Sequence, residues 1–210
     1  MFGRKPKKDR FQGKTLYTVD EYLEIESRLC ESYEFSDGDV GRLNEPEFFI
    51  ESVLKLQKTL SDKLAGSGFQ VFSNFLSKKK KIWVAAENSL RYPSLFVVDG
   101  AVTYGLDRED IVENPLMIIE VSTFYSMTVM NGKRGDQKYL SDRTGRFWSY
   151  RKIPSLNEYV LVSNNGQTMV ETYNRLSDRS WKHQIYTESE NDSINFESID
   201  ITLPVTDFYL

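Results

Sequence analysis

The sequence predicts one α/β domain built around strands that are buried on both faces. Two continuous apolar runs, Leu95–Val98 and Leu116–Ile119, are typical of central strands covered on both sides. Apolar residues at helical spacing over residues 46–65 predict a long helix that packs on the sheet, with Gly66 placed to end it. Shorter alternating segments after residue 158 predict an antiparallel extension.

The other elements follow from local patterns. Thr18-Val19-Asp20-Glu21 is a capping box and predicts a short helix directly after it. Aromatic residues flank Glu34, and Asp37-Gly38 is a turn signal, so residues 33–40 predict a hairpin in which Glu34 points away from the apolar face. Strands are predicted at Phe69–Asn74, Lys81–Ala86, Leu95–Val98, Pro115–Val121, Glu158–Ser163, Met169–Tyr173 and Trp181–Tyr186.

Length and composition favour a single folded unit. The chain has 210 residues, of which 40% are hydrophobic, enough to bury a sizeable core. No internal repeat or linker divides it, so we predict a flexible basic arm over residues 1–14 and one domain over residues 15–210. Residues 122–146 have a weak pattern and predict an irregular loop, which is either functional or a tolerated insertion.

Composition excludes several classes of site. Cys30 is the only cysteine and His183 the only histidine, which excludes an internal disulfide, a four-cysteine zinc site and histidine-rich metal sites. We interpret Cys30 as a packing residue and His183 as a surface residue on an edge strand. No run reaches the ~18 apolar residues of a membrane helix. The N-terminus has no apolar stretch of a secretory signal, so we expect a cytoplasmic protein without a membrane partner.

Positive charge is concentrated at the N-terminus. Five cations from Arg4 to Arg10, against Asp9, give the first ten residues a charge of +4. Because the net charge of the chain is −4, residues 11–210 carry −8. A basic arm on an acidic body suits a nucleic-acid tether, although a solvated tail explains the same charges. The run Lys78–Lys81 is open to two interpretations, phosphate contacts or a solvated start to a strand.

Two glutamates occupy positions where a carboxylate is costly. Glu120 ends an apolar run, at the edge of a strand predicted to be buried, and Glu34 lies inside an apolar strand pattern. Carboxylate oxygens are the ligands that Mg²⁺ and Mn²⁺ prefer, and such a metal activates water in phosphodiester hydrolysis. A structural ion pair with an arginine is the more common arrangement for such residues, so both interpretations stay open.

The order of these segments resembles the Uma-two family of restriction-endonuclease-like proteins, in the PD-(D/E)XK superfamily. The resemblance begins at about Leu16 and continues to Leu210, and its motifs are distributed along the chain. They are YEFSDGD at residues 33–39, similar to the family's YELIDGE; RYPS at 91–94, similar to RYPD; NPLMIIEV at 114–121, similar to NPLLIVEV; and YRKIPSLNEYVLV at 150–162, similar to YRxIPSLxEYVLV.

The resemblance implies a restriction-endonuclease-like mixed central sheet flanked by helices, with a divalent metal at one end. Glu34 and Glu120 stand at two acidic positions of the family and would hold Mg²⁺ or Mn²⁺. The family's third acid, an aspartate, is Ser94 here, a neutral and weaker ligand. The family's lysine, four residues before Tyr150, is Arg146, which keeps the charge but cannot shuttle a proton.

Two residues are candidates to compensate for these substitutions. Asp99 lies five residues after Ser94, an offset that faces the opposite side of a regular strand. Lys138 would replace the lysine only if the predicted loop folds back, against the register fixed by the motif at residues 150–162.

Three functions stay open. The substitutions at Ser94 and Arg146 predict a restriction-endonuclease-like protein with impaired metal-dependent phosphodiester hydrolysis, and an active Mg²⁺-dependent endonuclease needs a relocated ligand. A catalytically inactive module that binds nucleic acid, DNA rather than RNA, is the second. The third is a protein-interaction module such as a homodimer, with Phe124, Tyr125 and Trp148 exposed at its interface, although core packing explains Trp148 equally well.

Overall fold

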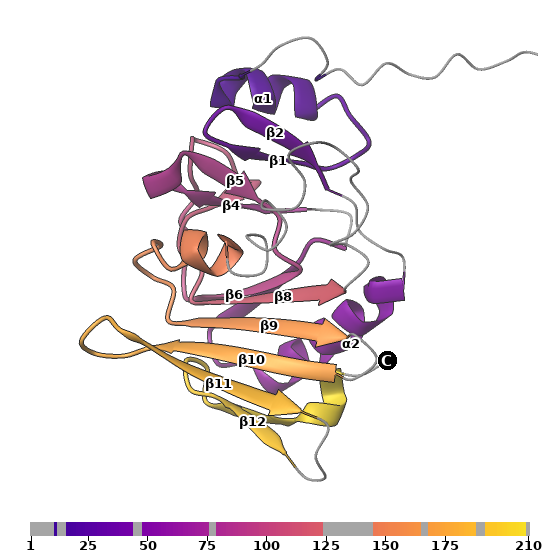
Figure 1. The fold of residues 1–210 in the computed structure, drawn as a ribbon, viewed down its shortest axis with the longest axis vertical. Helices are drawn as coiled ribbons and strands as arrows, with labels where there is room; N and C mark the ends of the chain where they lie inside the picture. Colours follow the sequence, from indigo (N-terminus) through magenta and orange to yellow (C-terminus); the bar gives the residue numbers. More distant parts are fainter. Residues whose placement is uncertain are drawn as a thin grey trace, which may run out of the picture.

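The computed structural model describes residues 11, 16–43, 48–75, 79–123, 145–164, 168–187 and 192–208. It is a mixed α/β protein in which strands predominate over helices (Figure 1). Within these residues the strands form a six-stranded, a five-stranded and a two-stranded sheet. The α/β class predicted from the sequence is therefore confirmed.

The six-stranded sheet is mixed. Its order is β11 (Trp181–Thr187), β10 (Thr168–Arg175), β9 (Glu158–Asn164), β8 (Met117–Thr123), β6 (Leu95–Asp99) and β3 (Phe69–Ser73). β8 and β9 run parallel, and all other neighbours run antiparallel. The predicted antiparallel extension is present as β9, β10 and β11, and the seven predicted strands match observed strands within a few residues, six of them in this sheet and Lys81–Ala86 as β4.

Both faces of the central strands β6 and β8 are buried, as the apolar runs predicted. Leu95 and Val97 pack on the side of helix α2 (Phe48–Lys63), whereas Phe96 and Val98 pack on the opposite side. This alternation is the normal consequence of the two-residue period of a strand. Helix α2 lies within the predicted range of residues 46–65, and Gly66 follows it with a left-handed φ of +80°.

The five-stranded sheet holds the N-terminal part of the chain. Its order is β2 (Asp39–Arg42), β1 (Tyr33–Ser36), β5 (Ser89–Arg91), β4 (Lys81–Val84) and β7 (Ile111–Val112), and helix α1 (Val19–Glu26) packs on it. In Figure 1 this sheet and α1 lie at the opposite end of the molecule from β10 and β11. The sequence patterns did not predict this second large sheet, because β5 and β7 are too short to leave a pattern.

The predicted hairpin is confirmed in its detail. Asp37 and Gly38 both have positive φ, 47° and 94°, between β1 and β2. Two left-handed residues in a two-residue loop match the twist of the strands they join. Tyr33 and Phe35 are buried on one face, so Glu34 points away from it, as predicted.

Short elements complete the two cores. A hairpin of β12 (Ser193–Phe196) and β13 (Ile201–Pro204), followed by the 3-10 helix η3 (Val205–Phe208), packs into the same core as α2. The 3-10 helix η1 (Ala85–Glu87) joins β4 to β5. Residues 145–150 are helical, and this orange helix lies between the two large sheets in Figure 1.

Parts of two predicted segments lie outside the described residues. Of the arm predicted over residues 1–14, Phe11 is described, and its ring packs on Tyr33 with centroids 4.8 Å apart. Of the predicted loop, residues 124–144 are outside, which includes Phe124, Tyr125 and Lys138. No helix among the described residues is long and apolar enough to cross a membrane.

Replacing Thr18 with alanine should destabilise the protein modestly. The Thr18 hydroxyl accepts the N–H of Glu21 at 3.2 Å, and the Glu21 carboxylate accepts the N–H of Thr18 at 2.9 Å. Loss of a helix N-cap lowers the free energy of unfolding by about 1 kcal/mol. Urea denaturation measures this, with Thr18→Ser as the control that keeps the hydroxyl. Equal losses in both variants would show that the capping bond contributes nothing.

Candidate functional site

The four residues singled out in the sequence converge between the two large sheets. Glu34 comes from β1 of the five-stranded sheet and Glu120 from β8 of the six-stranded sheet. Arg146 comes from the helical residues 145–150, and Ser94 directly precedes β6. Glu34 and Arg146 are 112 positions apart in the sequence, so only the tertiary fold brings them together.

Arg146 bridges the two glutamates. Its Nη2 lies 2.9 Å from both Oε1 and Oε2 of Glu34, and its Nη1 lies 2.8 Å from Oε1 of Glu120. The side chains of Arg146, Glu34 and Glu120 are 18%, 15% and 8% exposed. Such short, charge-assisted bonds in a poorly hydrated place are strong and directional. We call these three residues the Arg146 cluster.

Further donors complete the hydrogen bonding of the two carboxylates. The Tyr150 hydroxyl donates to Oε1 of Glu120 at 3.1 Å, and the Tyr92 N–H donates to Oε1 of Glu34 at 3.0 Å. Arg91 Nη1 lies 3.6 Å from Oε2 of Glu34. Arg91 and Arg146 thus balance the charge of Glu34 and Glu120.

These additional partners had no role in the sequence analysis, although signals for them exist. Tyr150 follows Arg146 by four residues, and residues at that spacing share one face of a helix. Arg91 lies on β5, whose Leu90 pairs with Phe35, the residue next to Glu34. Cross-strand neighbours of this kind are within reach of long side chains.

Ser94 contacts backbone as well as the cluster. Its Oγ accepts the N–H of Val121 at 3.1 Å, and it lies 3.5 Å from Oε2 of Glu120, the limit of a hydrogen bond. The hydroxyl therefore satisfies a backbone donor of β8 beside Glu120. A neutral oxygen that already accepts a hydrogen bond is a poor substitute for a carboxylate ligand.

Burial and charge act in opposite directions on the ionisable groups here. Burial raises the pKa of Glu120, and the nearby Arg146 opposes that rise. Burial also disfavours the charged guanidinium of Arg146, but Glu120 and Glu34 outweigh burial and hold its pKa well above the ordinary value. Burial and then Glu120 raise the pKa of Tyr150, so its hydroxyl stays a proton donor. Arg146 is consequently a permanent cation and not a proton carrier.

The residues present do not fit a divalent cation as they are arranged. Both oxygens of Glu34 and Oε1 of Glu120 accept bonds from Arg146, which leaves Oε2 of Glu120 beside Ser94. In the described part of the chain no group of three or more His, Cys, Asp or Glu side chains could hold a metal ion. Asp99 is exposed at the far end of β6 from Ser94 and offers no replacement.

Lys81, the last residue of the lysine run, has a different role from either interpretation made from the sequence. Lys81 is 4% exposed, and its Nζ lies 3.0 Å from Glu26 and 2.8 Å from Asp110. It is therefore a buried structural cation, because a buried ammonium must be paired. Lys79 donates to a serine hydroxyl and Lys80 to a backbone carbonyl, while residue 78 is outside the described ranges.

Three interpretations of single residues are also resolved. Cys30 is exposed and lies beyond the end of α1, so its role as a packing residue was wrong. Trp148 is 52% exposed, which rules out core packing. His183 lies on the edge strand β11 as predicted, but its ring stacks on Tyr173 with centroids 4.3 Å apart.

Comparison with known proteins assigns no function. No protein-family model matches the chain. The chain is 25% identical over 195 residues to the uncharacterized protein sll1609 of Synechocystis sp., a similarity that covers 89% of this chain and 96% of that protein. The two proteins are thus similar over nearly their whole lengths.

Proposed function

We propose that this chain is a restriction-endonuclease-like protein of the PD-(D/E)XK superfamily in which metal-dependent phosphodiester hydrolysis is impaired. The observation that supports this is the position of the Arg146 guanidinium, 2.8–2.9 Å from the carboxylate oxygens of Glu34 and Glu120. On the family resemblance, these two acids would hold the metal. In this chain the guanidinium of Arg146 neutralises the charge of the two carboxylates instead.

A divalent ion would have to displace Arg146. Displacement breaks the charge-assisted bonds to Glu34 and Glu120 and leaves a poorly hydrated guanidinium without a partner, which is strongly unfavourable. The free energy gained by binding the metal would be small, because Ser94 supplies a neutral oxygen in place of a third carboxylate. Both effects favour the ion pair over the metal.

Hydrolysis that uses the side chains of the cluster without a metal is also disfavoured. Both oxygens of Glu34 and Oε1 of Glu120 already accept hydrogen bonds from protein groups, so these oxygens are not free to orient an attacking water molecule. Arg146 can brace an anion but cannot exchange a proton near neutral pH. The cluster therefore has no group suited to activating water.

A calorimetric Mn²⁺ titration tests the proposal. We expect no binding by the native protein below about millimolar Mn²⁺, and binding at least about tenfold tighter by the double variant Ser94→Asp/Arg146→Lys. The aspartate restores a carboxylate ligand. The lysine is a compact point charge that cannot span both glutamates as the forked guanidinium does.

The matched control adds Glu120→Gln to the double variant, which should abolish the gained binding. Native protein that binds Mn²⁺ tightly, and loses this on Glu120→Gln, would contradict the proposal. The same proteins are assayed for nicking of plasmid DNA. Nicking by the native protein that disappears in Glu120→Ala would instead identify an active endonuclease, whereas nicking that survives this change comes from a contaminant.

A further inference from the structure

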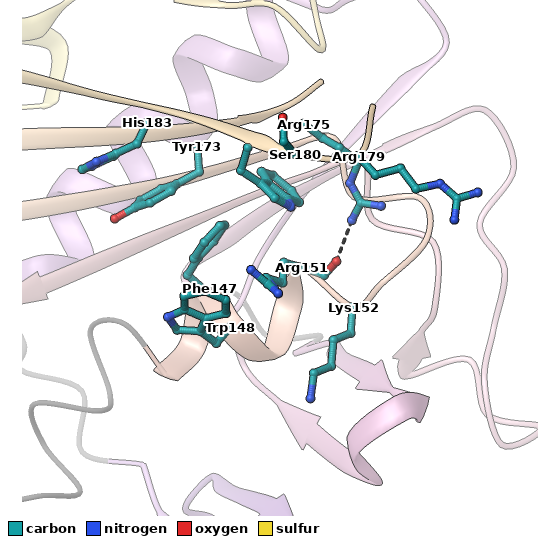
Figure 2. Close-up of a pocket in the computed structure, with 10 residues that line it drawn as sticks. Phe147, Trp148, Arg151, Lys152, Tyr173, Arg175, Arg179, Ser180 and His183 are labelled. Atoms are coloured by element: carbon teal, nitrogen blue, oxygen red, sulfur yellow. Dashed lines mark hydrogen bonds between the residues drawn. The ribbon is translucent and has the colours of Figure 1, made fainter. Parts of the chain in front are cut away.

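A second site lies on the outer part of the six-stranded sheet. A cavity of about 580 Å³ opens between the segment at residues 147–152 and strands β10 and β11 (Figure 2). Its lining combines aromatic rings with four basic side chains and includes no Asp or Glu. We call it the basic-aromatic pocket. Its volume is in the range of small-molecule sites, roughly 300–1,000 Å³.

Aromatic rings form one part of the pocket. Phe147 stacks on Tyr173 with centroids 4.2 Å apart, and Tyr173 stacks on His183. Trp181 meets Phe147 edge-on at 5.2 Å. Beside them Trp148 is half exposed, and the guanidinium of Arg151 lies over its ring, 3.8 Å from the centroid, so that one face is covered by Arg151 and the exposed area belongs to the rest of the ring. Ring faces presented in this way are suited to stacking against a flat, unpaired base.

Basic side chains form the other part. Arg151, Lys152, Arg175 and Arg179 line the pocket, and in Figure 2 the last three lie on the side away from Tyr173 and His183. Of these four, Lys152 is the one paired with a carboxylate, that of Glu87, within the described residues. Three guanidinium groups near one another without a carboxylate are a site for an anion.

Arg175 is fixed in place and incompletely satisfied. Its Nη2 donates to the backbone carbonyls of Arg151 at 2.7 Å and Ile153 at 2.9 Å, and it lies over the ring of Trp181. Its Nε is buried and has no hydrogen-bond partner in the described structure. Burial, and then the neighbouring Arg179 and Arg151, lower the pKa of Arg175, as expected where cations crowd together. A bound anion would relieve this repulsion.

We propose that the basic-aromatic pocket binds a nucleotide unit, with the base against the rings around Trp148 and the phosphate beside Arg175 and Arg179. The combination of a half-exposed Trp148 ring and three guanidinium groups without a carboxylate partner among the described residues matches a ligand that is flat at one end and anionic at the other. The base must be unpaired to enter, so the ligand is a free nucleotide or a unit of a single strand.

This site is separate from the function proposed above. It shares no residue with the Arg146 cluster, although Arg146 directly precedes Phe147 in the chain. A Mn²⁺ titration that contradicts the proposed function would not bear on ligand binding in the pocket. Absence of ligand binding in the pocket would likewise not bear on the role of the Arg146 cluster. The two proposals can therefore fail independently.

Tryptophan fluorescence measures binding directly. Trp148 and Trp181 line the pocket, and the third tryptophan, Trp83, lies on β4 in the other large sheet. We expect adenosine monophosphate to change the emission at low salt, and adenosine or inorganic phosphate alone to bind at least about tenfold more weakly. A short oligothymidylate serves as the single-stranded probe. Tighter binding of this strand identifies a strand site, and tighter binding of the monophosphate identifies a free-nucleotide site.

Two variants separate the two parts of the ligand. Trp148→Leu should weaken binding of both the monophosphate and the strand at least about tenfold, as measured through Trp181. Arg179→Gln should weaken both and reduce the dependence on salt, because it removes a phosphate contact. Lys182→Gln is the matched control. It lies beside His183 on β11 but pairs with Glu197 outside the pocket lining, so binding should be unchanged.

Two results would overturn the proposal. One is the absence of binding by either probe at low salt. The other is binding that Trp148→Leu and Arg179→Gln leave unchanged, since the ligand would then sit elsewhere. Circular dichroism confirms folding of each variant, and Trp148 is half exposed, so its replacement should not disturb the core.

Discussion

Replacing Arg146 with methionine is expected to lower the free energy of unfolding by about 3–5 kcal/mol. The substitution leaves Glu34 and Glu120 as two poorly hydrated carboxylates that have lost their shared cation. Removing one partner of a buried ion pair lowers the free energy of unfolding by far more than the intact pair contributes to it, because the remaining charge has no compensation. Urea denaturation near neutral pH gives the change as a shift in midpoint at constant slope.

A charge-balanced version of the same cluster is the control. Adding Glu120→Gln to Arg146→Met should recover more than half of the loss, because Glu34 keeps Arg91 as its cation and no charge is left without a partner. The variant Arg151→Met changes a half-buried arginine of the same segment, whose guanidinium lies over the Trp148 ring, and should cost about 1 kcal/mol or less. A loss for Arg146→Met as small as that for Arg151→Met would show that the cluster is well hydrated.

The pH dependence of Arg146→Met adds an independent check. Burial raises the pKa of Glu120, and Arg146 is the main group opposing that rise. A carboxyl whose folded pKa is raised favours the folded state at low pH and loses that contribution as pH rises through the folded pKa. Without Arg146, the variant should therefore regain stability relative to the native protein as the pH falls.

The Arg146 cluster also explains how the two large sheets are held together. Glu34 belongs to the five-stranded sheet and Glu120 to the six-stranded sheet, and Arg146 binds both from the helix between them. On the proposed function, the ion pair replaces a metal as the bridge between these elements. The two glutamates then have a structural role even where hydrolysis is lost.

Local patterns predicted the elements of this fold better than their assembly. The capping box at Thr18 and the turn at Asp37-Gly38 are visible because each depends on residues a few positions apart. The second large sheet was missed, since it depends on the pairing of β5 (Ser89–Arg91) with β1, in which Leu90 and Ser89 are matched at long range with Phe35 and Ser36. Such a pairing leaves no periodicity in the sequence.

The composition of the candidate site followed from the order of motifs, whereas its geometry did not. Glu34, Ser94, Glu120 and Arg146 lie together in the structure. Whether Arg146 braces a metal site or occupies its place depends on distances between two sheets, which no local pattern encodes. The burial of Lys81 was hidden for the same reason, because its partners come from α1 and from the loop before β7.

The second prediction concerns the pH dependence of stability, which we attribute to Glu158. It is the first residue of β9 and is fully buried, with Oε2 accepting the Ser198 N–H at 3.1 Å and the Ser198 hydroxyl at 2.7 Å. Its Oε1 has no partner among the described residues. Burial raises the pKa of Glu158 from 4.5 to about 7, and the bonds from Ser198 oppose this rise.

Because the folded pKa lies above the unfolded value, the folded protein holds a proton on Glu158 that the unfolded chain releases. The stability contributed by this group is complete below pH 4.5 and is lost as the pH rises through about 7. At 1.36 kcal/mol per pKa unit, the loss is about 3 kcal/mol. The native protein should therefore become less stable between mildly acidic and mildly alkaline solution.

The variant Glu158→Gln should remove this dependence, since an amide stays neutral and its oxygen can still accept both bonds from Ser198. It should match the native protein near pH 4.5 and exceed it by about 3 kcal/mol near pH 8. Denaturation midpoints across this pH range measure the difference. Glu24→Gln, which changes an exposed glutamate on α1, is the control that should leave the profile unchanged. A gap between Glu158→Gln and native protein that stays constant with pH would mean that Glu158 is ionised in the folded state throughout, and that solvent reaches its buried oxygen.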